Sequence, residues 1–340
     1  MSLIDVLCRT SDALFGERWS EKLKMAANVL LHEWHMFQSG SEWAASFLNV
    51  TDQEINETFK DLDAESREHI LRNVAFKRDF AVVGKKPEWY FYNYSKFYRK
   101  EELKRIPHVH AVLRRERWKY RSVRHVVLGY SESLVYHHGL VYCPEAVKAY
   151  LRGGVFLDVG ACYGDSTLVF ARHYHPGKIF AFEPSGLNRD ILHAIMEKNG
   201  IAPSLYEVVP LGLGREAKSV IYHEEQGAGN SLSNNEGGTT RLDIVACDVF
   251  CAERNLTAIK LIKADVEGMG LEMLLGAERV IRENRPVLSL SIYHNRDELF
   301  GIYRTLQDWN LDYRYIARML AFPINFGELS LLVWPRELER

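Results

Sequence analysis

Apolar residues in the C-terminal two thirds of the chain follow two alternating patterns. Short β-branched or aromatic runs are typical of strands, and between them apolar residues recur three or four positions apart, as on one face of a helix. The runs that predict strands are VFLDV (155–159), KIFAFE (178–183), LYEVVP (205–210), IKLIKAD (259–265), VLSLSIY (287–293), YRYIAR (313–318) and LSLLVWP (329–335). Strands that alternate with helices are joined by right-handed crossovers. The pattern predicts an α/β fold with a doubly wound, mostly parallel, seven-stranded sheet.

The sequence supports four further predictions about this C-terminal part of the chain. The last two runs have no helix between them, so they should pair antiparallel at one edge of the sheet. The segment SLVYHHGLVYC (133–143) predicts two strands joined by a turn at Gly139, and GLEMLLGAERVIRENR (270–285) predicts a single helix. A Gly-, Asn- and Ser-rich stretch at 224–240 predicts a surface loop, which connects two elements or lines a site.

The N-terminal half has a helical, charged pattern, with Thr51 and Glu54 spaced as a capping box. We expect a helical accessory domain over residues 1–122, which dimerises or shapes a substrate site, and a second domain over 123–340. Between Lys96 and Arg124 the sequence has eleven Lys or Arg against three Glu, interleaved with aromatic residues. Packing of aromatics between the two halves is the favoured interpretation, and binding of a nucleic acid or acidic partner is the alternative.

Composition restricts the class of protein. The net charge of -2 gives no global argument for nucleic acid or an anionic membrane, and five cysteines without metal or disulfide spacing suit a reducing compartment. Asp5 and Arg9 interrupt what would be the apolar core of a signal peptide, and no stretch of 18 uncharged apolar residues follows. We expect a soluble cytoplasmic protein.

The turn after the first predicted strand, VFLDVGACYGD (155–165), is the position where such sheets usually bind a cofactor. A dinucleotide turn has glycine at its first, third and sixth positions, but here these positions hold Gly160, Cys162 and Asp165. The Cys162 side chain obstructs a pyrophosphate, and the Asp165 carboxylate repels it at the helix start. NAD and FAD are therefore disfavoured.

S-adenosylmethionine, which lacks phosphate, fits this turn better. Asp158 could accept a hydrogen bond from its ammonium group, and the amides from Ala161 to Gly164 could face its carboxylate. Glu183 ends the next strand 23 residues after Gly160, where an acidic residue would accept both ribose hydroxyls, and Ser185 could open the next helix. The expected cofactor contacts are Asp158, Gly160, Ala161, Cys162, Tyr163, Gly164, Asp165, Glu183, Pro184, Ser185 and Asp265.

Two motifs resemble the FkbM-like family of class I S-adenosylmethionine-dependent methyltransferases. The first is FLDVGACYGD followed by AFEPS, and the second is LIKADVEGMGLEMLLGAERVIRENRP at 261–286. The resemblance extends from about Tyr142 to Trp334. It implies a Rossmann-like methyltransferase fold and transfer of a methyl group to oxygen on a small molecule, a sugar or a natural-product intermediate.

The sequence departs from the family pattern at several positions. Cys162 replaces the usual Asn, Lys260 replaces Asp, and Met269-Gly270 replaces an Ala-Glu pair. SIYHNRDEL resembles the branch of the family in which a tyrosine-histidine pair ends the strand. The missing acidic residue at 270 affects the acceptor site more than the cofactor site, so the alternative is a catalytically silent binding module.

Methyl transfer requires alignment of the two substrates and removal of a proton from the acceptor. Asp265 is the leading candidate for orienting the acceptor or taking its proton, with His294 as a second candidate base because an ordinary histidine titrates near neutral pH. Lys263, two residues before Asp265, could keep Asp265 ionised or bind an acidic acceptor. Glu267 is the fourth candidate, although Glu267-Gly268 could simply begin the next helix.

A divalent metal bound by Asp265, Glu267 and His294 is a less favoured alternative. The expected partners are S-adenosylmethionine, with S-adenosylhomocysteine as its product, and a small-molecule or glycan acceptor. A homodimer is compatible with the accessory half, whereas a membrane or nucleic-acid partner is not favoured.

Overall fold

The computed structural model describes residues 44–83, 99–101, 104, 111–112, 115, 119–121, 134–222, 239–320 and 328–339. The chain divides into two compact units, one of Met1–Leu48 with Lys77–Tyr92 and one of Asn49–Phe76 with Asn93–Arg340. Most of the predicted basic-aromatic segment lies outside the described residues. The domain boundary at residues 122 and 123 stays a prediction. The second unit contains all the strands that the structure describes.

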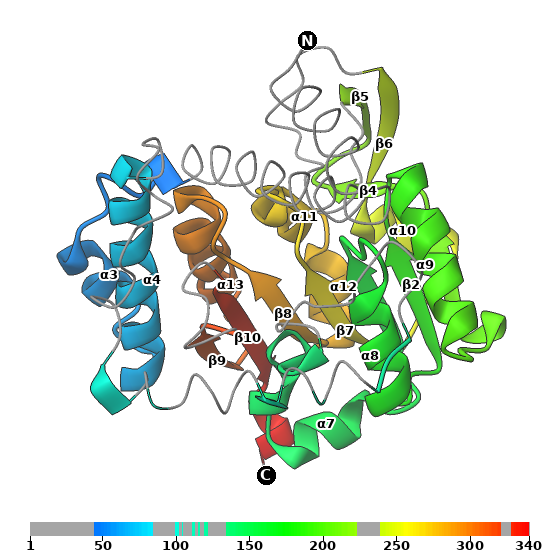
Figure 1. Ribbon diagram of the computed structural model, residues 1–340, viewed down its shortest axis with the longest axis horizontal. Coiled ribbons are helices and arrows are strands. Elements are labelled where there is room, and N and C mark those ends of the chain that lie inside the picture. The colour runs from blue at the N-terminus through cyan, green and yellow to red at the C-terminus, as the bar shows by residue number, and fades with distance from the viewer. Residues whose placement is uncertain are drawn as a thin grey trace, which may run out of the picture. The chain divides into compact units, whose positions relative to one another are not determined.

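A seven-stranded sheet forms the centre of this unit (Figure 1). Its strand order is β3-β2-β1-β7-β8-β10-β9, and the first five strands are parallel. β10 runs antiparallel to both β8 and β9, which confirms the predicted antiparallel edge. The strands are β1 (Val155–Val159), β2 (Lys178–Phe182), β3 (Tyr206–Val209), β7 (Ile259–Ala264), β8 (Val287–Ser291), β9 (Tyr313–Arg318) and β10 (Ser330–Pro335).

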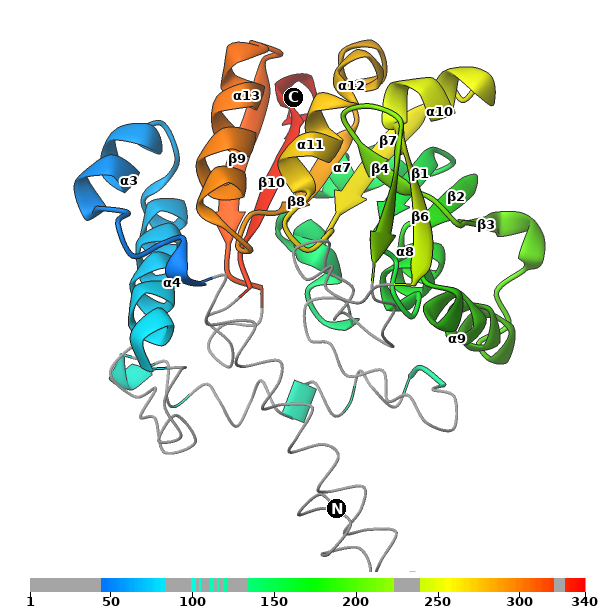
Figure 2. The ribbon, with the colours of Figure 1, turned by 90° about the horizontal axis from the view of Figure 1, so that it is seen from above.

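Helices cover both faces of the sheet. Figure 2 shows α8 (Asp165–His173) and α9 (Gly186–Lys198) on one side, with α10 (Cys247–Glu253), α12 (Glu278–Asn284) and α13 (Tyr303–Asp308) on the other. On β1, Phe156 lies against Phe170 of α8, with ring centroids 6.0 Å apart. On β2, Phe182 lies against Phe250 of α10 at 4.8 Å. Because successive strand residues face opposite layers and both layers are helical, the strand sequences are almost continuously apolar.

A second, three-stranded sheet was not predicted. It has the order β4-β6-β5 and consists of β4 (Gly212–Gly214), β5 (Lys218–Tyr222) and β6 (Thr240–Ala246). β4 has only three residues, two of them glycines, so its sequence carries little strand signal. Most of the predicted loop at 224–240 lies outside the described residues, but Thr240 already belongs to β6.

The predicted strand pair at 133–143 is wrong for its described part. From Leu134 to Cys143 the chain contains no strand, and His137–Tyr142 forms a 3-10 segment, η3. His137, His138 and Gly139 all have positive φ, at 47°, 49° and 86°. A strand needs negative φ at each residue, so these three consecutive left-handed residues interrupt it. Pro144 then precedes α7 (Glu145–Leu151).

The predicted helix over 270–285 is two helices, α11 (Gly270–Leu275) and α12. The break lies at Gly276, where α11 meets the small sheet. A Cβ atom at Gly276 would come 2.0 Å from the carbonyl oxygen of Gly214 in β4. Helical periodicity in the sequence does not reveal this close backbone approach.

The exposed edge of the main sheet is covered by the first part of α4 (Ala64–Val83), up to residue 76. Ser66 Oγ accepts a hydrogen bond from the Ala317 N–H of the edge strand β9 at 2.9 Å, and His69 Nδ1 accepts one from the Met319 N–H at 3.1 Å. These side chains satisfy amide groups that an edge strand would otherwise leave open. Arg318 adds an ion pair to Asp63 at 3.4 Å.

The N-terminus of α3 (Asp52–Thr58) confirms the Thr51 cap. The Thr51 side chain accepts a hydrogen bond from the Glu54 N–H at 3.1 Å. Among the described residues, no helix is both long and apolar enough to cross a membrane.

Gly276→Ala should destabilise the protein because the new methyl group meets the Gly214 carbonyl of β4. Overpacking of this kind typically costs about 2 kcal/mol of unfolding free energy. Gly200→Ala is the control, since φ is +70° there and no atom lies within 4 Å of the new Cβ, so only the left-handed backbone costs about 1 kcal/mol. Urea denaturation measures both; an equal loss in the two variants would contradict the close approach.

Candidate functional site

The turn after β1 is held tightly against the neighbouring strands. Gly160 has φ of +77°, and a Cβ atom there would come 1.9 Å from the Asp265 carbonyl oxygen, so only glycine fits. The amides of Gly160 and Ala161 both donate to the Phe182 carbonyl, at 3.1 and 3.0 Å. The Cys162 amide donates to Glu183 at 2.9 Å. The turn is therefore joined to both strands that flank β1.

Asp158 and Lys263 form a buried ion pair behind this turn. They are register partners on β1 and β7, and Lys263 Nζ lies 3.4 Å from Asp158 Oδ1 and 2.7 Å from the Gly160 carbonyl oxygen. Asp158 Oδ2 accepts hydrogen bonds from the hydroxyls of Ser166 and Thr167 in the first turn of α8, at 2.7 and 2.5 Å. Burial alone would lower the pKa of Lys263, but the carboxylates of Asp158 and Asp265 hold it above its usual value.

Glu183 follows β2 and has a buried carboxylate, 5 % exposed. One oxygen accepts the Cys162 N–H and the other accepts the Ser185 N–H at 2.8 Å. Burial raises the pKa of Glu183 to about 7, although these two N–H donors and Asn188 favour its ionised form. Ser185 caps α9 by accepting the Asn188 N–H, as predicted from the sequence.

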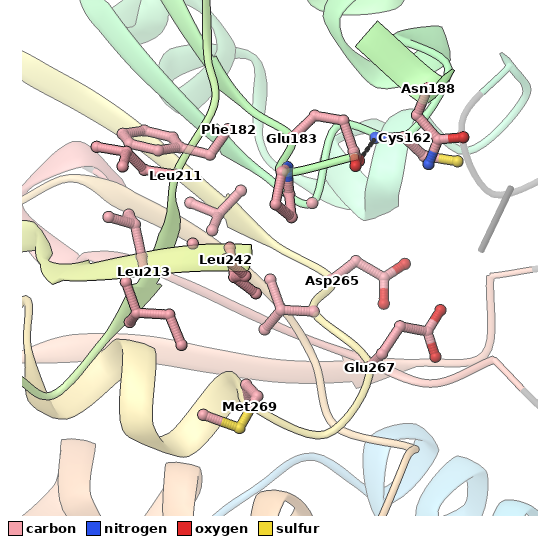
Figure 3. Close-up of a pocket in the computed structure, with 16 residues that line it drawn as sticks. Cys162, Phe182, Glu183, Asn188, Leu211, Leu213, Leu242, Asp265, Glu267 and Met269 are labelled. Carbon is pink, nitrogen blue, oxygen red and sulfur yellow. Dashed lines mark hydrogen bonds between the residues drawn. The ribbon is translucent and has the colours of Figure 1, made fainter. Parts of the chain in front are cut away.

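A cavity of about 840 Å³, including the part open to solvent, lies beyond the carboxyl ends of β1, β2 and β7. Figure 3 shows that it has an apolar end and a polar end. The apolar end is lined by Phe182, Leu211, Leu213 and Leu242, and the polar end by Cys162, Glu183, Asn188, Asp265 and Glu267. The small sheet supplies Leu213, Leu242 and Ile244, so this unpredicted element completes the cavity.

Acidic side chains surround the imidazole of His294 at the polar end. His294 Nε2 lies 3.3 Å from Asp265 Oδ1 and 3.6 Å from Glu267 Oε2, while Nδ1 lies 2.9 Å from Glu298 Oε2. The Tyr293 hydroxyl donates to Asp265 Oδ1 at 3.2 Å. Asp265 and Glu267 keep about one fifth of their side-chain surface exposed, whereas His294 is buried.

The premise that His294 titrates at its ordinary pKa is wrong. Burial alone would lower its pKa, but Glu298, Glu267 and Asp265 raise it to about 10, so the ring is a cation at neutral pH. A protonated imidazole has no lone pair to take a proton or bind a metal. Among the described residues, no group of three or more His, Cys, Asp or Glu side chains is arranged to hold a metal ion.

The two carboxyl groups near Nε2 of His294, those of Asp265 and Glu267, differ in acidity. Burial would raise the pKa of Asp265, but the charges of His294 and Lys263 bring it below its usual value. Burial, together with the neighbouring carboxylates of Asp265, Glu328 and Glu298, raises the pKa of Glu267 to about 8 in spite of the charge of His294. Asp265 is therefore ionised at neutral pH. Glu267 loses its proton at a slightly higher pH, near 8.

The structure brings some of the predicted site residues together and leaves others outside the cavity. Those that line it are Gly160, Cys162, Glu183, Pro184, Asp265 and Glu267. Those that do not are Asp158, Ala161, Tyr163, Gly164, Asp165, Ser185, Lys263 and His294.

Two of the predicted roles need correction. Lys263 is buried against Asp158 and the Gly160 carbonyl, so binding of an acidic acceptor by Lys263 is wrong, while its effect on Asp265 agrees with the prediction. The amides of Ala161, Cys162 and Gly164 already donate to acceptors within the chain, so they do not present free donors to a cofactor carboxylate. Contact of Asp158 with the cofactor ammonium stays a prediction.

Several residues of the cavity and its surroundings were missed in the sequence. Leu213 lies on the three-residue strand β4, and Leu242 and Ile244 lie on β6, which was not predicted as a strand. Glu298 follows His294 by four residues, a spacing that brings two side chains together on a helix and could have identified the pair.

Known proteins share part of this sequence and this fold. Residues 158–315 match the family described as the methyltransferase FkbM domain. Among solved structures, the chain is similar to methyltransferase FkbM from Methylobacillus flagellatus KT, with a TM-score of 0.52, 18 % identity, and coverage of 82 % of this chain and 58 % of that one. The chain thus spans less than two thirds of that protein's length, and the similarity supports the fold.

Two further solved structures are more distant. An rRNA methylase from Streptococcus thermophilus has a TM-score of 0.38 and 12 % identity, over 56 % of this chain and 92 % of that chain. An O-methyltransferase from Bacillus cereus in complex with SAH has a TM-score of 0.38 and 14 % identity, over 70 % of this chain and 92 % of that chain. No curated protein sequence matches the chain.

Asp158→Asn should destabilise the protein by about 3 kcal/mol, because it leaves the Lys263 ammonium buried without a charged partner. Ser166→Ala is the matched control. It removes one neutral donor to Asp158 while Thr167 remains, which should cost about 1 kcal/mol. Chemical denaturation separates the two variants; similar losses would mean that the ion pair does not matter more than one hydroxyl contact.

Proposed function

We propose that the chain transfers a methyl group from S-adenosylmethionine to a hydroxyl oxygen. The match of residues 158–315 to the methyltransferase FkbM domain supports this proposal. The acceptor class is a small molecule, a sugar or a natural-product intermediate. The observation that carries this proposal is the position of Glu183. Its buried carboxylate lies between an apolar pocket and the acidic residues Asp265 and Glu267.

The residues of the cavity fit an adenosyl cofactor. A nucleoside needs an apolar surface for its base and an acceptor for its ribose hydroxyls, and Leu213, Leu242 and Ile244 provide the surface while Glu183 provides the acceptor. Two backbone amides and the Asn188 side chain donate to the Glu183 carboxylate, which has about four lone-pair sites, so one site remains for a ribose hydroxyl. No side chain at Gly160 obstructs the approach to the turn.

S-adenosylmethionine supplies an activated methyl group, so the chain itself must align the acceptor and remove its proton. Glu267 is the better proton acceptor, because a pKa of about 8 is closer to neutral pH than that of Asp265. Asp265, which is ionised and held by Tyr293 and His294, orients the acceptor hydroxyl. His294 acts as a fixed cation between the two carboxyl groups.

Glu183→Gln tests the cofactor site. Isothermal titration with S-adenosylhomocysteine should show binding to the unaltered chain and at least a tenfold weaker affinity in the variant, since a neutral amide is a weaker acceptor for a ribose hydroxyl than an ionised carboxylate. Asp190→Asn on the following helix α9, whose carboxyl group does not line the cavity, is the control. Equal affinities for the Glu183→Gln variant and the unaltered protein would remove Glu183 from the site.

The affinity for S-adenosylhomocysteine should fall as pH decreases through about 7, the pKa of Glu183. Binding uses the ionised carboxylate, so below its pKa a proton must first leave, and affinity should drop about tenfold for each pH unit. Titrations between pH 6 and 8.5 measure this slope. The Glu183→Gln variant should show a flat profile over this range; the same slope in the variant would assign the effect to another group.

Glu267→Gln should lower turnover at saturating cofactor by about 100-fold, the usual contribution of a positioned base. In the unaltered protein, turnover should rise with pH up to about 8, because Glu267 must lose its proton to act as a base. Turnover is measured by release of S-adenosylhomocysteine with an acceptor found in a screen of sugar and polyketide hydroxyls. A variant that keeps both its rate and its pH profile would exclude Glu267 as the base.

A further inference from the structure

The carboxylate of Glu298 is buried and has both oxygens in use. Its exposed fraction is 1 %. Oε1 accepts a hydrogen bond from the Gly270 N–H at 2.7 Å, at the first residue of α11, and Oε2 lies 2.9 Å from His294 Nδ1. Glu298 begins a π-helical segment, η5 (Glu298–Ile302), which follows the end of β8. One side chain therefore links this segment to both His294 and the start of α11.

The same carboxylate occupies the space beside Gly270. A Cβ atom at Gly270 would come 2.8 Å from Glu298 Oε1 and 3.3 Å from Ile302 Cδ1. The pattern of the FkbM-like family, which this sequence resembles, has Glu at position 270. In this chain Gly270 has no side chain, and the carboxylate of Glu298 from η5 occupies the space beside it.

Residues 294–298 hold the turn between β7 and α11 at three places. His294 contacts Asp265 and Glu267. Asn295 donates to the Gly268 carbonyl at 3.3 Å and accepts the Glu298 N–H at 2.8 Å. Glu298 accepts the Gly270 N–H.

This turn needs external support. Glu267 and Gly268 are both left-handed, with φ of 50° and 96°. For a residue with a side chain, such as Glu267, this conformation is strained and persists only where neighbouring groups hold it. The contacts from residues 294–298 provide that support, and they do so directly beside the cavity.

We infer that Glu298 supplies, from the segment after β8, the carboxylate that the family pattern carries at position 270, and that it positions Asp265 and Glu267 at the cavity by holding His294 and the start of α11. Glu298 is a positioning residue, since it acts through His294 and the turn. The inference rests on the proposed function, because its test measures the affinity for S-adenosylhomocysteine. If Glu298 supplies this carboxylate, Gly270 is not by itself evidence that the protein is catalytically silent.

Relocating the carboxylate tests this inference. Glu298→Ala leaves the Gly270 N–H and His294 without their acceptor, and should weaken S-adenosylhomocysteine binding about tenfold. Gly270→Glu alone should weaken it similarly, because its side chain meets Glu298. The double variant Gly270→Glu/Glu298→Ala should bind within about threefold of the unaltered chain, since the carboxylate returns to the vacated space. Isothermal titration measures all four proteins.

Leu306→Ala separates positioning from general stability. Leu306 is a fully buried residue of α13 and does not line the cavity, so its loss should lower the melting temperature without changing the affinity. Glu298→Gln keeps an acceptor for the Gly270 N–H and replaces Glu298→Ala if the latter does not fold. A double variant that binds no better than Glu298→Ala, or an affinity loss in Leu306→Ala that matches it, would overturn the inference.

Failure of the proposed function has a different signature. In that case the unaltered chain does not bind S-adenosylhomocysteine at all. The four proteins are then compared by thermal unfolding, where the double variant should be more stable than either single variant. A double variant less stable than both would overturn the relocated carboxylate on its own.

Discussion

The buried pair of Asp158 and Lys263 is the interaction on which the site depends. It fixes the register of β1 against β7, and through Ser166, Thr167 and the Gly160 carbonyl it also fixes the first turn of α8 and the bend before it. A desolvated ion pair is tolerated only when its remaining lone pairs and protons find partners. The bend has little freedom to move without breaking one of these contacts, so the cavity beside it has a defined shape.

Chemically similar groups at the cavity differ in their pKa values. Glu183, Asp265 and Glu267 are all carboxyl groups near strand ends, yet burial raises the pKa of Glu183 and Glu267, while His294 and Lys263 lower that of Asp265. Separation of the acidities of neighbouring carboxyl groups is a common way to divide orienting and proton-accepting tasks. The imidazolium of His294 and the ammonium of Lys263 contribute to this separation, because both favour the charged form of Asp265.

Elements outside the main sheet complete the site and protect the fold. The small sheet of β4, β5 and β6 provides the apolar end of the cavity, and the break at Gly276 lets α11 approach it closely. At the β9 edge of the main sheet, Ser66 and His69 accept hydrogen bonds from backbone amides in and next to the strand. These contacts join residues far apart in the chain, so their sequence signals are weak: β4 is three residues long, and Ser66 and His69 are ordinary residues of a polar helix.

The sequence by itself determined the main sheet, its antiparallel edge, the turn at Gly160, and the carboxylates Glu183, Asp265 and Glu267 at strand ends, because periodicity and strand boundaries are local properties. Only the tertiary structure decided that His294 is a cation, that Lys263 faces Asp158 instead of an acceptor, and that Glu298 fills the space beside Gly270. A pKa and a filled space depend on groups brought together from separate elements, and a single stretch of sequence contains neither.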